Sequence, residues 1–287
     1  MCLRNREDMP SKIIPREHRD AMVAAYLAGA TAEEAAAQFG YSYMACIYTL
    51  KQRGINPRGR SEAHRRYAVD EAFFDVINTE EKAYWLGFLT ADGTIRENVV
   101  MLALQERDID HLYKYTSSLR SKHPITLKEN TLAGETYRCA QVSIGSSRLA
   151  TALKRLGVAE RKSFTVRPCE YVPDHLISHY WRGVFDGDGY ITQKGSGSFG
   201  ARQWIVGLVG NREIVSGFET FMQQCLDWKA RVEPDKPGSH IFKVRYNGVA
   251  LPQAVLYILY TNAIVFLERK YDRMRDVMST PVQRKRR

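Results

Sequence analysis

Two aspartates that each precede a glycine are the residues whose type and spacing could support metal chemistry. Asp92-Gly93 follows the apolar stretch WLGFLTA, and Asp188-Gly189 follows the stretch WRGVFDG. Both stretches predict a mostly apolar helix that ends at the acid, where the backbone dipole is already negative. A carboxylate is unfavourable there unless a cation shares the site. Two such helix ends brought together would form an oxygen-rich pocket for a hard divalent metal.

The two copies resemble the nine-residue motif of the LAGLIDADG homing endonucleases. A single apolar helix that ends in Asp-Gly is common, but two copies one repeat length apart match the single-chain members of that family, which carry two repeats. The resemblance covers roughly residues 78 to 287. It implies a monomeric, site-specific, Mg²⁺-dependent endonuclease that makes a double-strand break in a long DNA target.

The resemblance also implies which residues bind the metal. Asp92 and Asp188 would hold two or more Mg²⁺ ions at the interface of the repeats, assisted by the main-chain carbonyls of Ala91 and Gly187. The ions would activate water and stabilise the leaving 3′ oxygen in an in-line phosphodiester displacement. The alternative is that each aspartate merely ends a helix.

Two further positions of the motif differ in what they imply. Gly87 and Gly183 occupy equivalent places, and a missing side chain allows two helices to approach backbone to backbone. In the family these helices pack together where the repeats meet, which implies the same packing here. Asp186 has no acidic counterpart, because Thr90 stands at its place in the first copy. We therefore expect no metal role for Asp186.

Phosphoryl transfer also needs a cation and a proton-handling group near the scissile phosphate. Lys162 follows the last helix of the first repeat, Lys270 has the corresponding place in the second, and both look like the central lysines of the family. Gln105 resembles its strand-end polar residue that orients water, and Asn211 is the closest match in the second repeat. Simple solvation at the surface is the alternative for all four.

The order of the predicted elements gives an α+β fold. Each half of residues 78–287 is expected to form helix, hairpin, helix, hairpin, helix, as two pseudo-symmetric αββαββα repeats over 78–170 and 171–287 with a curved antiparallel β platform. The first repeat is predicted as helix 80–91, strands 93–96 and 99–104, helix 109–119, strands 125–128 and 137–144, and helix 148–156. The second is predicted as helix 175–185, strands 189–193 and 203–209, helix 213–226, strands 230–233 and 241–246, and helices 249–259 and 266–278.

The platform would recognise DNA, because alternate side chains of a strand point to opposite faces and every second one can enter a groove. The candidates are Arg96, Arg138, Gln141, Gln193, Lys194, Arg202, Gln203, Lys243 and Arg245. The Gly- and Ser-rich tip 194–200 resembles a flexible finger that orders on DNA. The basic stretch 284–287 would either contact phosphate or remain solvated.

Residues 1–55 need their own argument. Three short helices are predicted over 16–28, 32–39 and 43–53, with a capping box of Thr31 and Glu34 at the second. Helix, glycine turn, helix is the helix-turn-helix signature, which favours DNA contact by the third helix. The side chains expected at the major groove are Ser42, which can also cap the helix, Tyr43, Tyr48 and Lys51. A helix bundle that only braces the next domain is the alternative.

Residues 56–77 are predicted to be a basic linker. Within residues 56–67, Arg58, Arg60, Arg65 and Arg66 stand against a single acid, Glu62. Extended arginine-rich arms often lie along the minor groove, whose negative potential attracts guanidinium groups. A solvated flexible linker is the alternative.

Composition restricts the function classes. The 287 residues carry a net charge of +10, which favours a polyanionic partner such as nucleic acid, with a merely basic enzyme as the alternative. The five cysteines form no Cys-x-x-Cys pair, which argues against a zinc site or a disulfide framework and for a reducing compartment. With no signal-peptide core and no apolar run of membrane-spanning length, we expect an intracellular protein, cytoplasmic or nucleoid-associated, without a membrane partner.

Two function classes therefore remain at this point. The first is the homing endonuclease, and the second is a non-cleaving DNA-binding regulator or an RNA maturase that uses the same fold. Retention of both motif acids and both lysines favours the enzyme. A small-molecule cofactor is not expected, because the sequence has no cofactor-binding glycine-rich loop. We expect a free-standing protein encoded by an intron or a phage, because we find neither a splicing block at the start nor a His-Asn pair before the end.

Overall fold

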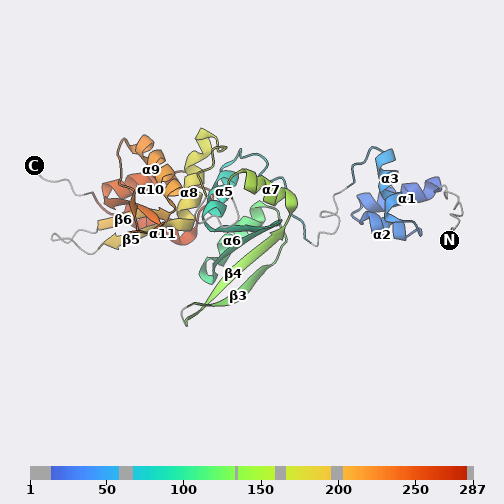
Figure 1. Ribbon diagram of the computed structural model, residues 1–287, viewed down its shortest axis with the longest axis horizontal. Coiled ribbons are helices and arrows are strands. Elements are labelled where there is room, and N and C mark those ends of the chain that lie inside the picture. Colours follow the sequence, from blue (N-terminus) through green and yellow to red (C-terminus); the bar gives the residue numbers. More distant parts are fainter. Residues whose placement is uncertain (1–13, 58–66, 133–134, 159–165, 195–202, 283–287) are drawn as a thin grey trace, which may run out of the picture. The chain divides into compact units, whose positions relative to one another are not determined.

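The computed structural model describes residues 14–57, 67–132, 135–158, 166–194 and 203–282 (Figure 1). The chain forms two compact units, residues 1–66 and residues 67–287. We call them the N-terminal unit and the repeat unit. Among the helices that these ranges contain, none combines the length and the apolar character that crossing a membrane requires.

The N-terminal unit contains three helices, α1 (Arg16–Leu27), α2 (Ala32–Ala37) and α3 (Tyr43–Gln52), which confirms the predicted elements. They enclose a small core that includes Met22, Cys46 and Leu50 together with the small alanines of α2, which allow close packing. The capping box of Thr31 and Glu34 is confirmed. Ser42 is the N-cap residue of α3, but its side chain makes no capping hydrogen bond, so the predicted cap is wrong.

The repeat unit has the predicted αββαββα order twice. The first repeat comprises α5 (Glu80–Asp92), β1 (Gly93–Arg96), β2 (Val99–Gln105), α6 (Ile109–Ser118), β3 (Ile125–Leu132), β4 (Glu135–Gly145) and α7 (Ser147–Arg155). The second comprises α8 (Ile177–Asp188), β5 (Gly189–Lys194), β6 (Gln203–Gly210), α9 (Arg212–Leu226), β7 (Glu233–Pro234), β8 (Phe242–Gly248) and α10 (Ala250–Tyr260), followed by α11 (Glu268–Met278).

The strands form two antiparallel sheets with matching strand order, β1-β2-β4-β3 and β5-β6-β8-β7. This repetition is the pseudo-symmetry that the two motifs predicted. In each sheet one face is buried against helices, as Val100 and Leu102 show in the first and Val206 and Leu208 in the second. The other face carries polar and partly exposed side chains, and we call it the open face.

Several element boundaries differ from the prediction. The β3–β4 hairpin extends well beyond the predicted strands, because polar residues without an apolar pattern still pair in register from Glu129–Arg138 to Thr131–Thr136. Strand β7 is shorter than predicted, and Pro234 explains its end because proline has no backbone N–H for the ladder. Helix α8 begins at Ile177, after a short 3₁₀ turn.

The predicted linker over 56–77 is wrong in its second half. Residues 67–77 belong to the repeat unit, and the side chains of Phe73, Phe74 and Ile77 are buried in its core. The backbone N–H of Asp70 also donates to the carbonyl of Leu119 at 2.7 Å. Burial of two aromatic rings outweighs the polar composition of this stretch, so the first repeat begins before residue 78.

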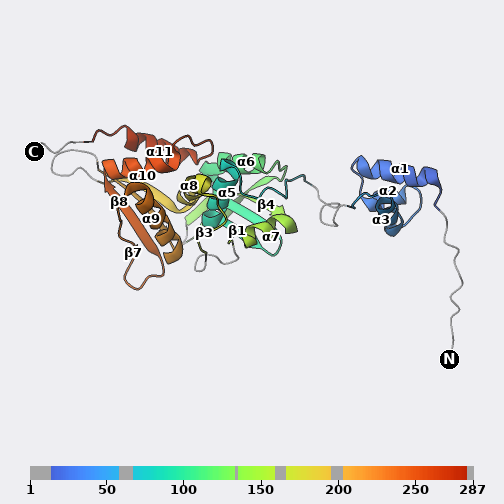
Figure 2. The ribbon, with the colours of Figure 1, turned by 90° about the horizontal axis from the view of Figure 1, so that it is seen from above.

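Helices α5 and α8 lie side by side in the middle of the repeat unit (Figure 2). A Cβ atom built on Gly87 would lie 2.0 Å from the carbonyl oxygen of Tyr180, and one built on Gly183 would lie 2.1 Å from that of Tyr84. Both distances are far below van der Waals contact. The predicted backbone-to-backbone packing is confirmed, and both helices need glycine at the crossing.

We expect Gly87→Ala and Gly183→Ala each to lower the free energy of unfolding by about 3 kcal/mol, because a methyl group at the crossing forces the helices apart. Denaturant titration of the whole chain measures the loss. Gly145→Ala is the matched control, since nothing lies within 4 Å of a Cβ there. Equal stability of the crossing variants and the control would contradict this packing.

Candidate functional site

Asp92 and Asp188 are the last residues of α5 and α8, and the close packing of these helices brings their ends together. A Cβ atom built on Gly187 would lie 2.3 Å from Cβ of Ala91 and 3.3 Å from Oδ2 of Asp92. The carboxylate of Asp92 therefore lies against the last turn of α8 at Gly187, the residue before Asp188 in the chain. The structure thus joins all four predicted metal-binding residues at one place.

Lys270 completes this group from the first turn of α11. Its side chain is buried, with 5% of the residue exposed, and its ammonium donates to the carbonyl oxygens of Phe185 at 2.6 Å and Gly187 at 3.2 Å. A cation at this position also offsets the negative end of the α8 dipole. The resemblance identified Lys270 as a central lysine of the family, and the structure puts its ammonium at the end of α8.

The pKa of Lys270 is lowered from 10.5 to about 8. Burial is the largest cause, because it disfavours the charged form, and the charge of Arg269 acts in the same direction. The carboxylates of Asp186, Asp92 and Asp188 oppose the shift. Both motif acids are therefore close enough to the ammonium to act on its charge.

The oxygens at the two helix ends suit a hard divalent cation. Among the described residues there is no cluster of three or more His, Cys, Asp or Glu side chains that could hold a metal. Asp92 and Asp188 would supply the anionic ligands of such a cation, with the carbonyls of Ala91 and Gly187. The Gly187 oxygen already accepts from Lys270 but has a second lone pair. Such a set fits Mg²⁺, which keeps several waters and binds substrate phosphates.

The two predicted water-orienting amides differ in their surroundings. Gln105 is exposed at the end of β2. Asn211 is buried at the N-cap of α9, where its Oδ1 accepts from the N–H of Ile214 at 2.9 Å and its Nδ2 donates to the carbonyl of Val166 at 2.8 Å. Both ends of the Asn211 amide are thus engaged in holding the backbone. Asn211 and Asp188 line one cavity of about 250 Å³. Lys162 lies outside the described residues.

The strand register sorts the predicted DNA-binding residues by face. Arg138 alternates in phase with the buried Ala140 and Val142, and Gln193 pairs with the buried Trp204. Both therefore lie on the helix-covered faces of the sheets, not on the open faces. The open faces carry Arg96, Gln141, Lys194, Gln203, Lys243 and Arg245. Arg202 and residues 195–200 lie outside the described part of the chain.

Partners hold some of the open-face side chains in place. The Lys128 ammonium donates to the Gln141 amide oxygen at 3.0 Å, although the sequence analysis did not select Lys128. Its alternation with Thr126 along β3 could have identified it. Arg245 pairs with Glu233 at 2.5 Å, and Lys243 pairs with Asp235 at 3.2 Å. The Arg245 pair is at the surface, where such pairs are weak, so Arg245 can exchange its partner for phosphate. Lys243 is half-buried and also donates to the backbone carbonyl of Asp235 at 3.0 Å.

A basic cavity of about 320 Å³ lies beside Lys270. Its lining includes Arg107 from the first repeat and Arg269, Arg273 and Tyr190 from the second. Arg269 is bound to the buried carboxylate of Asp108 at 2.9 Å, which fixes its position. No local pattern in the sequence predicts this cavity, because its residues lie far apart in the chain.

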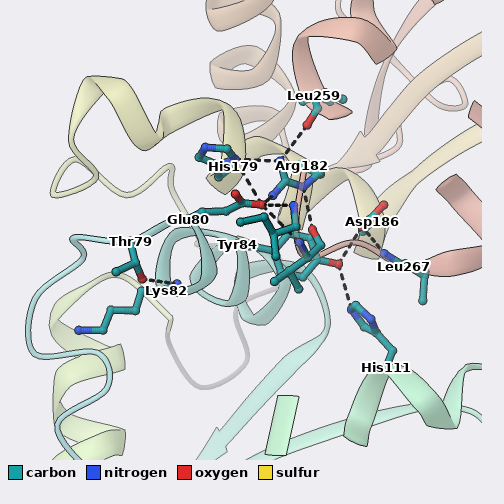
Figure 3. A network of polar contacts seen from close by, with 12 residues as sticks. Thr79, Glu80, Lys82, Tyr84, His111, His179, Arg182, Asp186, Leu259 and Leu267 are labelled. Atoms are coloured by element: carbon teal, nitrogen blue, oxygen red, sulfur yellow. Dashed lines mark hydrogen bonds and ion pairs between the residues drawn. The ribbon is translucent and has the colours of Figure 1, made fainter. Parts of the chain in front are cut away.

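A network of polar side chains runs through the core of the repeat unit (Figure 3). Arg182 is fully buried and donates to Glu80 at 2.5 Å and to the carbonyls of Val265 at 2.9 Å and Leu259 at 3.0 Å. Asp186 is also fully buried. The sequence analysis assigned no role to Arg182 and only excluded Asp186 from metal binding. Two charged residues inside an apolar helix are the signal that could have identified the network.

The chain is similar in fold to several solved structures. The meganuclease I-SmaMI bound to DNA is 12% identical, with 68% of this chain and 88% of that chain covered and a TM-score of 0.49. The LAGLIDADG meganuclease I-AabMI bound to DNA is 11% identical, with 68% and 88% covered and a TM-score of 0.46. Full-length DUF199/WhiA from Thermatoga maritima is 13% identical, with 75% and 67% covered and a TM-score of 0.43.

The chain is thus similar to LAGLIDADG homing endonucleases, the family that its two motifs resemble. The sequence matches no family model and no curated protein. At these identities and TM-scores the likeness says nothing of activity, so the function rests on the chain's own residues.

His111 belongs to the same buried network and is held neutral. The Tyr84 hydroxyl donates to Asp186 at 2.7 Å and lies 2.9 Å from Nε2 of His111. Because the single hydroxyl proton is directed to Asp186, Nε2 must carry the imidazole proton and donate to Tyr84. Burial, followed by the charges of Lys114 and Arg269, lowers the pKa of His111 to about 3.

This lowered pKa gives an expected loss of stability in acid. Below pH 6.5 the unfolded chain takes up a proton at His111 that the folded chain refuses until about pH 3, so this contribution is lost as the pH falls. Between pH 7 and pH 4 the free energy of unfolding of His111→Gln, which keeps a donor for Tyr84, should fall by about 3 kcal/mol less than that of wild type. Denaturant titrations at both pH values measure this, with exposed His175→Gln as control. An equal fall in the free energy of unfolding for wild type and His111→Gln would contradict this expectation.

The N-terminal unit presents the predicted residues of α3 at its surface. Tyr43 and Tyr48 are 38% and 63% exposed, and Ser42 and Lys51 are exposed as well. An exposed face with two aromatic rings, a hydroxyl and a cation agrees with the predicted recognition helix but does not test DNA contact. Arg58, Arg60, Arg65 and Arg66 lie outside the described residues.

Proposed function

We propose that this protein is a site-specific DNA endonuclease that makes a double-strand break by metal-dependent hydrolysis of phosphodiester bonds. The observation that carries the proposal is the junction of the motif helices. Their backbones are in contact at Gly87 and Gly183, and their ends place Asp92 and Asp188 beside the ammonium of Lys270. Two carboxylates at the negative ends of two helices are costly unless they bind cations, and a metal supplies that charge.

Each group at the junction has a role in this chemistry. Asp92 and Asp188, with the carbonyls of Ala91 and Gly187, would hold Mg²⁺, which would supply an activated water and charge stabilisation at the leaving 3′ oxygen. The Lys270 ammonium would lie against the phosphoryl oxygens and stabilise the charge that develops there. The exposed amide of Gln105 would orient water. Lys162 would stabilise the charge on the other scissile phosphate, as Lys270 does on the first.

The open faces of the sheets would bind the duplex. They carry cations and amides that can contact phosphates and base edges, and the chain has a net charge of +10. The pseudo-two-fold relation of the repeats suits the two strands of a duplex, because each repeat can present one set of groups to one scissile phosphate. The residues proposed to face DNA are Arg96, Lys128, Gln141, Lys194, Gln203, Lys243 and Arg245.

A cleavage selection tests the proposal. The whole chain is incubated with a randomised duplex library in Mg²⁺, and the cut ends are sequenced. We expect double-strand breaks at one recurring sequence, and none when EDTA is present. A protein that enriches one duplex sequence but never cuts it would instead be a DNA-binding regulator. Selective binding of structured RNA without DNA cleavage would indicate a maturase.

We further propose that the N-terminal unit extends the DNA contact. Its basic and aromatic third helix and the arginines that follow would add phosphate and base-edge contacts on one flank of the target. Residues 67–287 have their own hydrophobic core, so removing residues 1–66 leaves the repeat unit complete.

Deletion of residues 1–66 should shorten the footprint on one flank and weaken binding. The salt dependence of affinity should flatten by about 0.9 in log–log slope for each phosphate that the protein no longer touches. The cut position should stay unchanged. Footprinting and salt titration of both proteins on the selected target measure this. Tyr43→Ala with Tyr48→Ala in the whole chain should reproduce part of the effect. An identical footprint and slope would show that the unit does not bind this DNA.

A further inference from the structure

Asp186 is a buried carboxylate that accepts three hydrogen bonds. It is fully buried, and its Oδ2 accepts from the hydroxyl of Tyr84 at 2.7 Å and from the backbone N–H of Leu267 at 2.8 Å. Its Oδ1 accepts from the hydroxyl of Tyr260. A buried carboxylate is costly without such partners, so these three donors fix Asp186 and are fixed by it.

The bond to Leu267 connects Asp186 with Lys270. Leu267 is the N-cap residue of α11, and its carbonyl accepts from the backbone N–H of Lys270 at 3.0 Å. From that first turn the Lys270 ammonium reaches back to the carbonyls of Phe185 and Gly187, which flank Asp186 in the chain. Helices α8 and α11 are thus connected twice. Asp186 of α8 binds the start of α11, and Lys270 of α11 binds the end of α8.

The segment that leads into α11 is held by the same two motif helices. Arg182 of α8 donates from Nε to the carbonyl of Val265 at 2.9 Å. Glu80 of α5 accepts from the backbone N–H of Ile264 at 2.7 Å and binds Arg182 at 2.5 Å. Side chains of the motif helices therefore hold residues 264–267 by their backbone (Figure 3). Asp186 holds the last residue of this segment, Leu267, and so contributes directly to the position of the first turn of α11 and of the Lys270 ammonium.

The first repeat lacks this carboxylate. Thr90 stands at the place of Asp186, and its hydroxyl donates to the carbonyl of Leu86 within its own helix at 2.8 Å. Thr90 also interacts with the hydroxyl of Tyr180, which accepts from the backbone N–H of Cys169 at 3.3 Å. A pair of hydroxyls therefore stands here where the second repeat has a carboxylate. The two halves of the junction are therefore built differently, although their backbones follow the same order.

We propose that Asp186 is a positioning residue for Lys270, and that it serves the cleavage of only one of the two DNA strands. The inference rests on the proposed endonuclease function, because Lys270 acts at a phosphate in that proposal. Asp186 itself touches neither DNA nor metal in this role. It sets the place of the ammonium through Leu267.

Asp186→Asn tests the proposal in the whole chain. The asparagine keeps the shape but has one acceptor oxygen, so it cannot accept from donors on both sides as the carboxylate does. On supercoiled plasmid with the selected target, we expect one strand to be cut about tenfold more slowly and the other within about twofold of wild type. Nicked circles should accumulate with the nick always in the same strand, while the Kd for target in Ca²⁺ changes by less than about twofold.

A double-mutant cycle with Lys270→Met distinguishes positioning from general damage. If Asp186 acts through Lys270, Asp186→Asn should not slow the Lys270→Met protein further, and both single variants should spare the same strand. Asp110→Asn, at an exposed acid on α6, is the control, and it should leave the ratio of the two strand rates within about twofold of wild type. Tyr260→Phe keeps the carboxylate and removes one donor, so it should slow the same strand by about threefold even if Asp186→Asn does not fold.

The outcomes separate the two proposals. Equal slowing of both strands, or single-variant effects that multiply in the double variant, would show a general structural role and overturn the inference while leaving the endonuclease in place. Equal rates of cleavage of the two strands by folded Asp186→Asn, or by Tyr260→Phe, would also overturn it. A wild-type protein that cuts no duplex would overturn the endonuclease and, with it, any role of Asp186 in cutting.

Discussion

Replacing either Asp92 or Asp188 with asparagine should abolish cleavage of both DNA strands, with rates lowered by at least about a thousandfold. Asparagine keeps the shape of the side chain but removes the charge that would bind the metal. Because the two carboxylates lie at one junction, each substitution should affect both halves of the site. Specific binding should remain, since both acids stand at the helix ends and the open faces keep their cations.

The measurement compares strand-cleavage rates at saturating protein with the Kd of the same variant in Ca²⁺, which should allow binding without cutting because it prefers longer and looser coordination. Asp110→Asn is the matched control, because Asp110 is an exposed acid on α6 of the same unit. It should cut as wild type does. Normal cutting by Asp92→Asn or Asp188→Asn at ordinary Mg²⁺ concentration would refute the metal assignment.

Lys270→Met should slow cleavage by about a hundredfold without a comparable loss of affinity. The ammonium is buried against the end of α8 and contributes little surface for ground-state binding. A contact that forms with the transition state lowers the rate when it is removed, whereas a ground-state phosphate contact lowers affinity. Lys162→Met is expected to slow cleavage in the same way, with the effect on the opposite strand.

Lys128→Met is the contrasting control for Lys270. Lys128 is an exposed cation on the open face of the first sheet, so its removal should weaken binding and leave the rate at saturation unchanged. Single-turnover cleavage at several protein concentrations separates the two quantities. If Lys270→Met behaved like Lys128→Met, with lower affinity and an unchanged saturated rate, Lys270 would be only a backbone anchor.

Much of the fold was readable because each repeat carries its own local signals. The apolar motif helices, the alternation in β1, β2 and β6, and the short glycine-bearing turns predicted the αββαββα order. Gly87 and Gly183 were informative in a different way, since equivalent glycines in two similar helices predicted a close crossing that the structure confirms. Duplication converted a weak local signal into a statement about tertiary packing.

The errors arose where the outcome depends on partners far away in the chain. The faces of Arg138 and Gln193 could not be predicted, because a shift of one residue in strand register reverses every side chain, and the register is set by pairing. Residues 67–77 have a linker-like composition, yet Phe73 and Phe74 find a core to enter. The role of Asn211 as the N-cap residue of α9 was also not predicted, and its role in orienting water stays a prediction.

The buried network could not be read from spacing at all. Asp186 was compared only with Thr90, its equivalent in the first motif, and the lack of an acid there excluded a shared metal role. Its principal partner is a backbone amide, that of Leu267, and a backbone group has no signature in the sequence. Lys270 was selected by resemblance alone, whereas its buried ammonium and lowered pKa require the fold.

The proposed chemistry depends on one divalent metal site between the ends of α5 and α8. Iron-directed cleavage of the protein can locate such a site. Fe²⁺ bound in place of Mg²⁺ on the selected DNA target reduces added hydrogen peroxide to hydroxyl radicals, with ascorbate returning Fe³⁺ to Fe²⁺, and the radicals cut the nearest backbone. We expect cuts at both motif ends, at residues 91–93 and 187–189. Excess Mg²⁺ should suppress these cuts by displacing the bound Fe²⁺. Cuts at only one of these ends, or at neither, would contradict a shared metal site.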